Sequence, residues 1–316
     1  MLTARLDPAL GVRVVSARAL RYTVPAATDA DRPPHVRAAS GLALTGGRLV
    51  VVQDDAAFIA TVAGDKVSAL ALPRGPSGRR RFEVALGNKQ DKLDLEACVA
   101  VGAELWAFGS GSAPARERVA VVGSDVRVLD AAPLYRALRD AAGGALNLEG
   151  VAAVGDELWL FHRGNTGPAD PGPAVVRLPR APLADWLADP AAGPPPAPLG
   201  ASRFDLGTLG GARLGFTDAA ARGDRVLYLA AAESAPNAID DGPARGSQLG
   251  VIDGVIDGPL DGANVRAAPL SHGDLPLKAE GLALDPRDPH RAWIVVDPDD
   301  VAQPAQLYEL ELSGPW

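Results

Sequence analysis

Cysteine is nearly absent from this sequence, in which Cys98 is the only one among 316 residues. A lone cysteine excludes an intramolecular disulfide and any metal site built from several Cys ligands. Long apolar runs are also missing, because no window approaches the roughly 18–20 residues of a membrane helix. The N-terminus lacks the apolar stretch of a signal peptide. We therefore expect a soluble, cytoplasmic protein with no membrane partner.

Basic residues are in deficit, with 31 Lys and Arg against 39 Asp and Glu and a net charge of −8. Duplex nucleic acid and anionic membranes both require a concentrated basic surface, so neither is expected as a partner. Apolar residues make up 47% of the chain, enough for a buried core. The 35 Gly and 28 Pro indicate many turns and few long helices.

One pattern recurs five times along the chain. A small or acidic residue precedes a short apolar run, a glycine-centred turn follows, and a charged residue then opens a stronger apolar run. The repeats begin at Ser40, Glu96, Glu149, Thr217 and Glu280, with spacings of 56, 53, 68 and 63 residues. Each half is short and bounded by turns, which favours strands. A hairpin repeat of this length is typical of a β-propeller blade.

The repeats predict an all-β protein, a single five-bladed propeller domain over 1–316 with four strands in each blade. The last repeat supplies only three strands, so we expect residues 12–20 to complete it beside residues 306–310 and remove a free edge. A sixth blade within 73–95 or 179–210 stays an alternative. Short helices are expected at 130–142 and 182–188.

This topology brings the start of each first strand and the end of each second strand to one end of the channel. The first set is Ser40, Glu96, Glu149, Thr217 or Asp218, and Glu280, and the second includes His162, Arg163, Glu233 and Asp297. We expect an acid-rich mouth, crossed by the connection that carries the helix at 130–142.

Carboxylates crowded at a channel mouth repel one another unless a cation or proton neutralises them. One hypothesis is a metal site, for which the candidate ligands are Glu96, Glu149, Asp218 and Glu280. Oxygen ligands in a ring suit Ca²⁺ and, less readily, Mg²⁺. The alternatives are that these acids cap turns, pair with lysines or bind a ligand directly.

Basic side chains near the mouth either pair with these glutamates or hold an anionic substrate. The candidate ligand-binding residues are Lys92, His162, Arg163, Glu233, Lys278 and Asp297. No catalytic residue is assigned, because no nucleophile elbow, P-loop or dinucleotide fingerprint is present in its strand–turn–helix context.

The segments 95–97, 148–150 and 279–281 each place a Glu before Ala or Gly and ahead of a strand bearing an aromatic residue. Together with Lys92 to Glu96, Leu134 to Leu138 and Asn147 to Gly150, in that order, they resemble the bacterial phytase-like (esterase-like activity of phytase) β-propellers. The resemblance implies a propeller and permits calcium-dependent hydrolysis of a phosphoester or ester of a small anionic molecule. Ser40 and Thr217 depart from Glu at two repeat positions, and a complete phytase calcium set is not identified. A non-catalytic propeller that binds a small ligand or a protein on the same face is the other function class.

Overall fold

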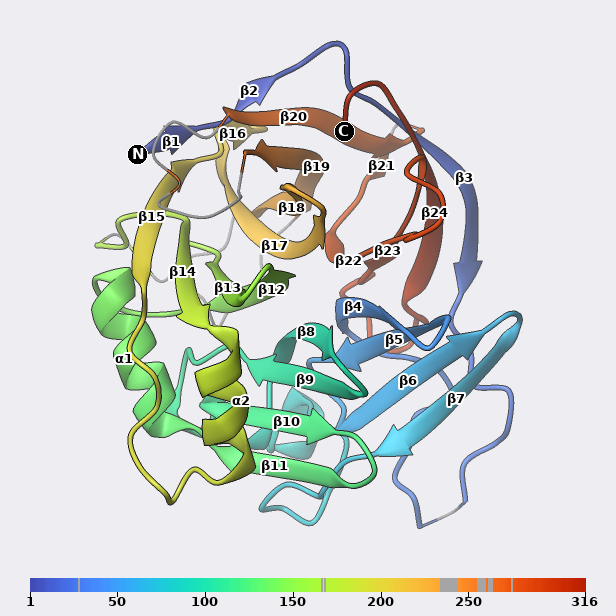
Figure 1. The fold of residues 1–316 in the computed structure, drawn as a ribbon. Coiled ribbons are helices and arrows are strands. Elements are labelled where there is room, and N and C mark those ends of the chain that lie inside the picture. The colour runs from blue at the N-terminus through green and yellow to red at the C-terminus, as the bar shows by residue number, and fades with distance from the viewer. Residues whose placement is uncertain are drawn as a thin grey trace.

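Five sheets stand around a central channel in the computed structural model (Figure 1). The structure describes residues 1–27, 29–165, 167, 169–233, 244–254, 260, 264–273 and 275–316. Blade 1 comprises β4 (Ala39–Thr45), β5 (Arg48–Gln53), β6 (Phe58–Ala63) and β7 (Lys66–Ala71). Blade 2 comprises β8 (Leu95–Val101), β9 (Glu104–Gly109), β10 (Arg118–Val122) and β11 (Val126–Asp130).

The later blades use segments from both ends of the chain. Blade 3 comprises β12 (Leu148–Val154), β13 (Glu157–His162), β14 (Ala174–Pro179) and β15 (Gly200–Asp205), with β1 (Leu2–Thr3) parallel to β15. Blade 4 comprises β17 (Ala212–Arg222), β18 (Arg225–Glu233), β19 (Ala244–Asp253) and β20 (Asn264–His272), extended by the short strands β2 (Arg5–Leu6), β16 (Thr208–Leu209) and β21 (Leu275–Pro276). Blade 5 comprises β22 (Ala279–Leu284), β23 (Arg291–Val296), β24 (Gln306–Ser313) and β3 (Gly11–Ala19).

The predicted closure is confirmed, because β3 pairs antiparallel with β24 from Ala19 opposite Gln306 to Gly11 opposite Ser313. The N-terminal strand therefore covers the edge that β24 would otherwise expose. Neither segment proposed for a sixth blade forms one: 73–95 contains two 3₁₀ turns, and 179–210 contributes α2, β15 and β16. The predicted all-β propeller of five blades is thus confirmed.

Two tryptophans explain how the repeated Glu-Leu-Trp segments pack. Trp106 and Trp159 are at most 2% exposed and lie in the apolar layers between neighbouring blades. Each indole Nε1 donates a 2.9 Å hydrogen bond to the glutamate two residues earlier, Glu104 or Glu157. Residues two apart on a strand share a face, so the acid that opens the strand satisfies the one polar atom of the buried ring.

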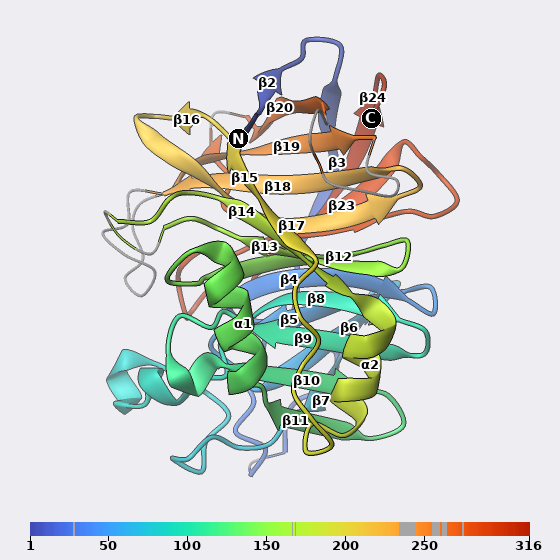
Figure 2. The same ribbon diagram turned by 60° about the vertical axis from the view of Figure 1, so that its left-hand side comes forward.

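Helix α1 (Ala132–Ala142) confirms the first expected helix, and α2 (Arg180–Ala188) overlaps the second. Asp130 Oδ1 accepts a bond from the amide of Ala132 at the start of α1, and Gly143, with φ of 73°, ends it. Both helices lie on the outside of the ring (Figures 1 and 2), where α1 packs into the core between blades 2 and 3. The connection that carries α1 leads from β11, the outermost strand of blade 2, to β12, the innermost strand of blade 3, and the helix itself contacts Gly109 and Gly111 at the end of β9. Within the described residues, no helix has the length and apolar character needed to span a membrane.

Candidate functional site

Every inner strand is interrupted by a β-bulge near the channel mouth. The residues skipped by the pairing register are Ser40, Glu96, Glu149, Thr217 and Glu280. A bulge re-aims the side chain of its extra residue. Three glutamates and two hydroxyl side chains therefore leave the regular in–out alternation at the same level of the ring.

The two hydroxyl side chains join neighbouring blades. Ser40 Oγ donates to the carbonyl of Leu95 at 2.5 Å, which ties blade 1 to blade 2. Thr217 Oγ1 donates to the carbonyl of Ala279 at 2.6 Å, which ties blade 4 to blade 5. Serine and threonine at these repeat positions thus have a structural use that a glutamate would not reproduce.

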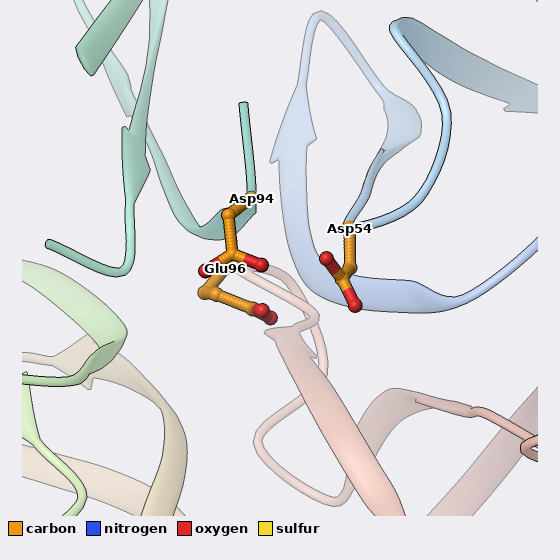
Figure 3. Close-up of side chains that lie close together, drawn as sticks. All are labelled: Asp54, Asp94 and Glu96. Atoms are coloured by element: carbon orange, nitrogen blue, oxygen red, sulfur yellow. The ribbon is translucent and has the colours of Figure 1, made fainter. Parts of the chain in front are cut away.

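An acidic triad of Asp54, Asp94 and Glu96 lies where the end of β5 meets the start of β8 (Figure 3). One oxygen from each carboxylate lies within 4.8 Å of the other two, so the triad could hold a metal ion. Lys92 Nζ pairs with Asp54 and, at 2.5 Å, with Asp94. Arg116 approaches Asp94 at 3.1 Å from the other side.

The three triad carboxyls have different affinities for protons. Burial raises the pKa of Asp54 to about 7 against the attraction of Lys92, and its hydrogen bond with Asp94 adds to the rise. Burial raises the pKa of Glu96 well above its ordinary value, and the charges of Asp54 and Glu149 raise it further. Although burial opposes it, Lys92 and Arg116 hold the pKa of Asp94 well below its usual range. The triad therefore contains one permanent anion and two carboxyls that favour a proton or a cation.

Arg163 organises a second group of carboxylates on blades 3 and 4. It lies 2.8 Å from Glu233 and 3.4 Å from Glu149, and all three side chains are less than 10% exposed. Burial raises the pKa of Glu149 to about 8 despite the attraction of Arg163. Asn147 also donates a 2.7 Å bond to Glu149. Arg163 thus joins two buried carboxyls, of which Glu149 favours the protonated form.

Lys278 organises a third group on blade 5. Its Nζ lies 2.6 Å from Asp299 and 3.5 Å from Glu280. Burial raises the pKa of Asp297 well above its ordinary value, against Lys278 and together with Asp299. Burial likewise raises the pKa of Glu280. Lys278 thus pairs with the exposed Asp299 and lies beside two carboxyls whose pKa values are raised.

A pocket of about 210 Å³ opens between the triad and the Lys278 group. Its wall includes Asp54, Lys92, Lys278 and Asp297. The segment 82–84 and Lys89, which belong to the connection between blades 1 and 2, supply the outer wall. The pocket therefore brings three lysines into one cavity with three carboxyls whose pKa values are raised, those of Asp54, Asp55 and Asp297.

Asp218 is used differently from the other candidate metal ligands. The bulge falls at Thr217, so Asp218 takes the ring position that Gly41, Gly150 and Gly281 occupy in three other blades. Its oxygens accept amide bonds from Ala219 at 2.8 Å and Leu282 at 2.7 Å, and the amides of Leu42 and Val151 also bond to it. Burial raises the pKa of this carboxyl and the amide donors oppose the rise. Asp218 thus hydrogen-bonds to the backbone of the inner strands and is not part of the acidic triad.

His162 is fully buried, with Nε2 3.3 Å from Asp170 and Nδ1 against the backbone of Asn147. It fixes the end of β13 and is not part of the pocket wall. The structure thus forms three neighbouring groups, which are Glu96 with Lys92, Glu149 with Arg163 and Glu233, and Lys278 with Glu280 and Asp297. Their charges act on one another, because Glu149 raises the pKa of Glu96 and Arg163 lowers that of Glu280.

Asp54 and Asp94 were not among the candidate ligands. The sequence position of each residue could have pointed to the site. Asp54 directly follows the second strand of its repeat, and Asp94 lies between Lys92 and Glu96. The left-handed conformation of Asp94, with φ of 56°, turns its carboxylate toward Lys92 and Arg116. Such a turn cannot be anticipated from residue spacing.

A profile described as a family of unknown function, DUF6929, matches residues 35–312. The chain belongs to the DUF6929 family. No curated protein sequence matches this DUF6929 member.

The solved structures that match this DUF6929 chain share little sequence with it. The glutaminyl cyclase of Myxococcus xanthus has 10% identity and a TM-score of 0.50, with 96% of this chain and 97% of the other covered. An α-L-arabinanase of Cellvibrio cellulosa has 12% identity and a TM-score of 0.47, with 88% and 91% covered. A PQQ-bound aldose sugar dehydrogenase of Streptomyces coelicolor has 13% identity and a TM-score of 0.43, with 97% and 99% covered. The likeness to the cyclase supports the fold alone, and the resemblance to phytase-like propellers stays a prediction.

Proposed function

We propose that the pocket at the channel mouth binds a small anionic molecule and hydrolyses its phosphoester or ester bond with the help of a divalent cation. The observation that carries this proposal is that Asp54, one member of the acidic triad, lines the same pocket as the lysines Lys92 and Lys278. Such a pairing of cation ligands and ammonium groups suits a substrate that carries negative charge next to the bond to be broken.

The triad residues Asp54, Asp94 and Glu96 would hold the cation. Carboxylate oxygens suit calcium in preference to magnesium, because magnesium requires a stricter octahedral geometry and gives up its water reluctantly. The cation would polarise the scissile oxygen and lower the pKa of a bound water. Lys92 already contacts two of the triad carboxylates, so cation binding requires its ammonium group to turn toward the pocket.

The remaining pocket residues have roles that follow from their surroundings. Lys278 lies at the pocket wall with its side chain 11% exposed, and its ammonium would pair with an anionic oxygen of the substrate. Burial and the neighbouring Asp299 raise the pKa of Asp297, so Asp297 holds a proton that it can donate to the leaving-group oxygen. The two residues therefore divide substrate binding and proton transfer between them.

Thermal unfolding with calcium, with magnesium and with chelator tests the cation. A ligand at a hundredfold excess over its Kd stabilises the folded state by about 2.7 kcal/mol. We expect this stabilisation in the wild type and its loss in Asp54→Asn and Glu96→Gln. Asp300→Asn is the matched control, because Asp300 is an exposed carboxylate of the same pocket outside the triad. Equal melting of the wild type in calcium and in chelator would remove the cation from the proposal.

A panel of phosphomonoesters and carboxylic esters then tests the chemistry. Asp297→Asn is the variant expected to lose turnover while it keeps calcium binding.

The second candidate function is that of a non-catalytic propeller that binds a small anion at the same pocket. The observation in its favour is that Lys92 already neutralises much of the triad. Calcium-independent binding of an anion without turnover would favour this second function.

A further inference from the structure

A second pocket, whose lining includes four arginines, lies on the mouth face outside the site described above. It has a volume of about 540 Å³, and its charged lining residues are Asp29, Asp31, Arg32, Arg74, Arg79 and Arg81. Four positive and two negative charges give this pocket a net positive charge, in a chain whose overall charge is −8. Lysines and carboxylates line the mouth pocket, whereas arginine is the only basic residue in this one.

Two loops build the arginine pocket. One leads from β3 to β4 and the other from β7 to β8, and both lie at the end of the ring where β5 and β7 finish. The second loop also supplies Phe82, Glu83 and Val84 to the mouth pocket. The two pockets are therefore separate cavities that share one loop.

Asp31 positions two of the arginines. It has a φ of 54°, and its carboxylate accepts bonds from the amide of Arg80 at 2.9 Å and from Arg81 Nε at 3.0 Å. Arg79 lies 3.5 Å from the same carboxylate, and its side chain is 50% exposed. Because one buried carboxylate is shared by these groups, most of the guanidinium donors of Arg79 and Arg81 are left for another acceptor.

The other two arginines are held by backbone carbonyls and a ring. Arg74 donates to the carbonyl of Gly78 at 2.9 Å and to that of Asp29 at 2.5 Å, and it thereby joins the two loops. Arg32 stacks over the ring of Tyr22, with 4.3 Å from its guanidinium carbon to the ring centroid, and donates to the carbonyl of Val24. Neutral partners leave the positive charge of both side chains uncompensated.

We propose that this arginine pocket binds the phosphate group of a small phosphorylated molecule. Guanidinium groups bind phosphate oxygens through paired, charge-assisted hydrogen bonds, which a fixed cluster of arginines provides without reorganisation. The cavity lies in the size range of pockets that enclose whole small molecules, so room remains for the group that carries the phosphate. Polymeric nucleic acid fits poorly, because these basic groups are confined to two loops of an acidic protein.

Isothermal titration with pyrophosphate, in chelator and at matched ionic strength, tests the proposal. We expect saturable binding that Arg79→Gln weakens about tenfold or more, as loss of a charge-assisted contact requires. Arg79→Lys keeps the charge but loses the paired geometry, so it should also weaken binding. The matched control is Arg48→Gln, which removes the same charge from an exposed position on blade 1 outside both pockets and should leave the Kd unchanged.

Sulfate and citrate in place of pyrophosphate test the chemical class. Equal binding of all three anions would overturn the assignment to phosphate, as would equal weakening by Arg79→Gln and Arg48→Gln. Melting of each variant in chloride alone verifies that it folds. Chelator removes any cation from the triad, and because Arg79 lines the arginine pocket and not the mouth pocket, weakening by Arg79→Gln separates binding here from anion binding at the mouth.

Discussion

Replacing Glu149 with glutamine should stabilise the protein at alkaline pH and leave its stability nearly unchanged at acidic pH. Burial raises the pKa of this carboxyl from 4.5 to about 8, Arg163 opposes the rise and Glu280 adds to it. The folded protein therefore binds the Glu149 proton more tightly than the unfolded chain does.

The size of the effect follows from that difference. Between pH 4.5 and about pH 8 the unfolded chain has lost the proton while the folded protein keeps it, so this carboxyl lowers the free energy of unfolding as pH rises. Once both states are ionised, the loss amounts to about 5 kcal/mol. Glu149 is only 5% exposed, so solvent screens the charge of its carboxylate little and reduces this free-energy loss little. Glutamine has the same shape and cannot ionise, so the variant keeps the free energy of unfolding that the wild type loses as the pH rises.

Urea unfolding of the wild type and Glu149→Gln, in chelator and at pH values below 4.5, near 7 and above 8, measures this difference directly. Titrations of all other groups largely cancel in the comparison, and the lowest pH serves as the internal control because both side chains are neutral there. A variant less stable than the wild type above pH 8 would refute the reasoning. It would mean that the pair between Glu149 and Arg163, at 3.4 Å, contributes more than burial of the carboxylate costs.

Two further predictions concern the ring. Deleting residues 1–22 removes β3 together with the buried Leu10 and Leu20, each worth about 2 kcal/mol, so calorimetry should find a melting temperature lower by about 10 °C or more. A melting temperature close to that of the wild type would show that β24 does not need its partner strand. Asp218→Asn replaces a carboxylate oxygen with an amide donor facing backbone N–H groups, so urea unfolding should register a loss of about 2–4 kcal/mol. Unchanged stability would contradict the structural use assigned to Asp218.

The fold could be predicted because its information is local. Each blade repeats a strand, a glycine turn and a second strand, and turns such as those at Gly102 and Gly155 adopt φ values of 60° and 53° that glycine accommodates best. Three complete strands in the last repeat, with one missing, sufficed to identify residues 12–20 as the closing strand. Blade count and closure both follow from counting such units.

The site could be predicted only in part, because side-chain direction depends on where each bulge falls. A shift of one residue turns a side chain to the other face of a strand. Thr217 and Asp218 were left as alternatives at one repeat position, and only the register of β17 with β18 separates them. The neighbours of Glu96 are likewise set by loop conformation, since Asp54 comes from the end of β5 and Asp94 from a residue in the left-handed region.

Asp218 connects the architecture of the ring with the chemistry of its mouth. Its carboxylate bonds to amides of β4, β12, β17 and β22, so one side chain spans four of the five inner strands. Close approach of these strands requires glycine at the equivalent positions: a Cβ on Gly150 would lie 2.8 Å from the Cα of Asp218. The bulge residues therefore lie one position nearer the mouth than the level at which this carboxylate joins four inner strands, so the backbone that carries the mouth glutamates is tied together directly beneath them.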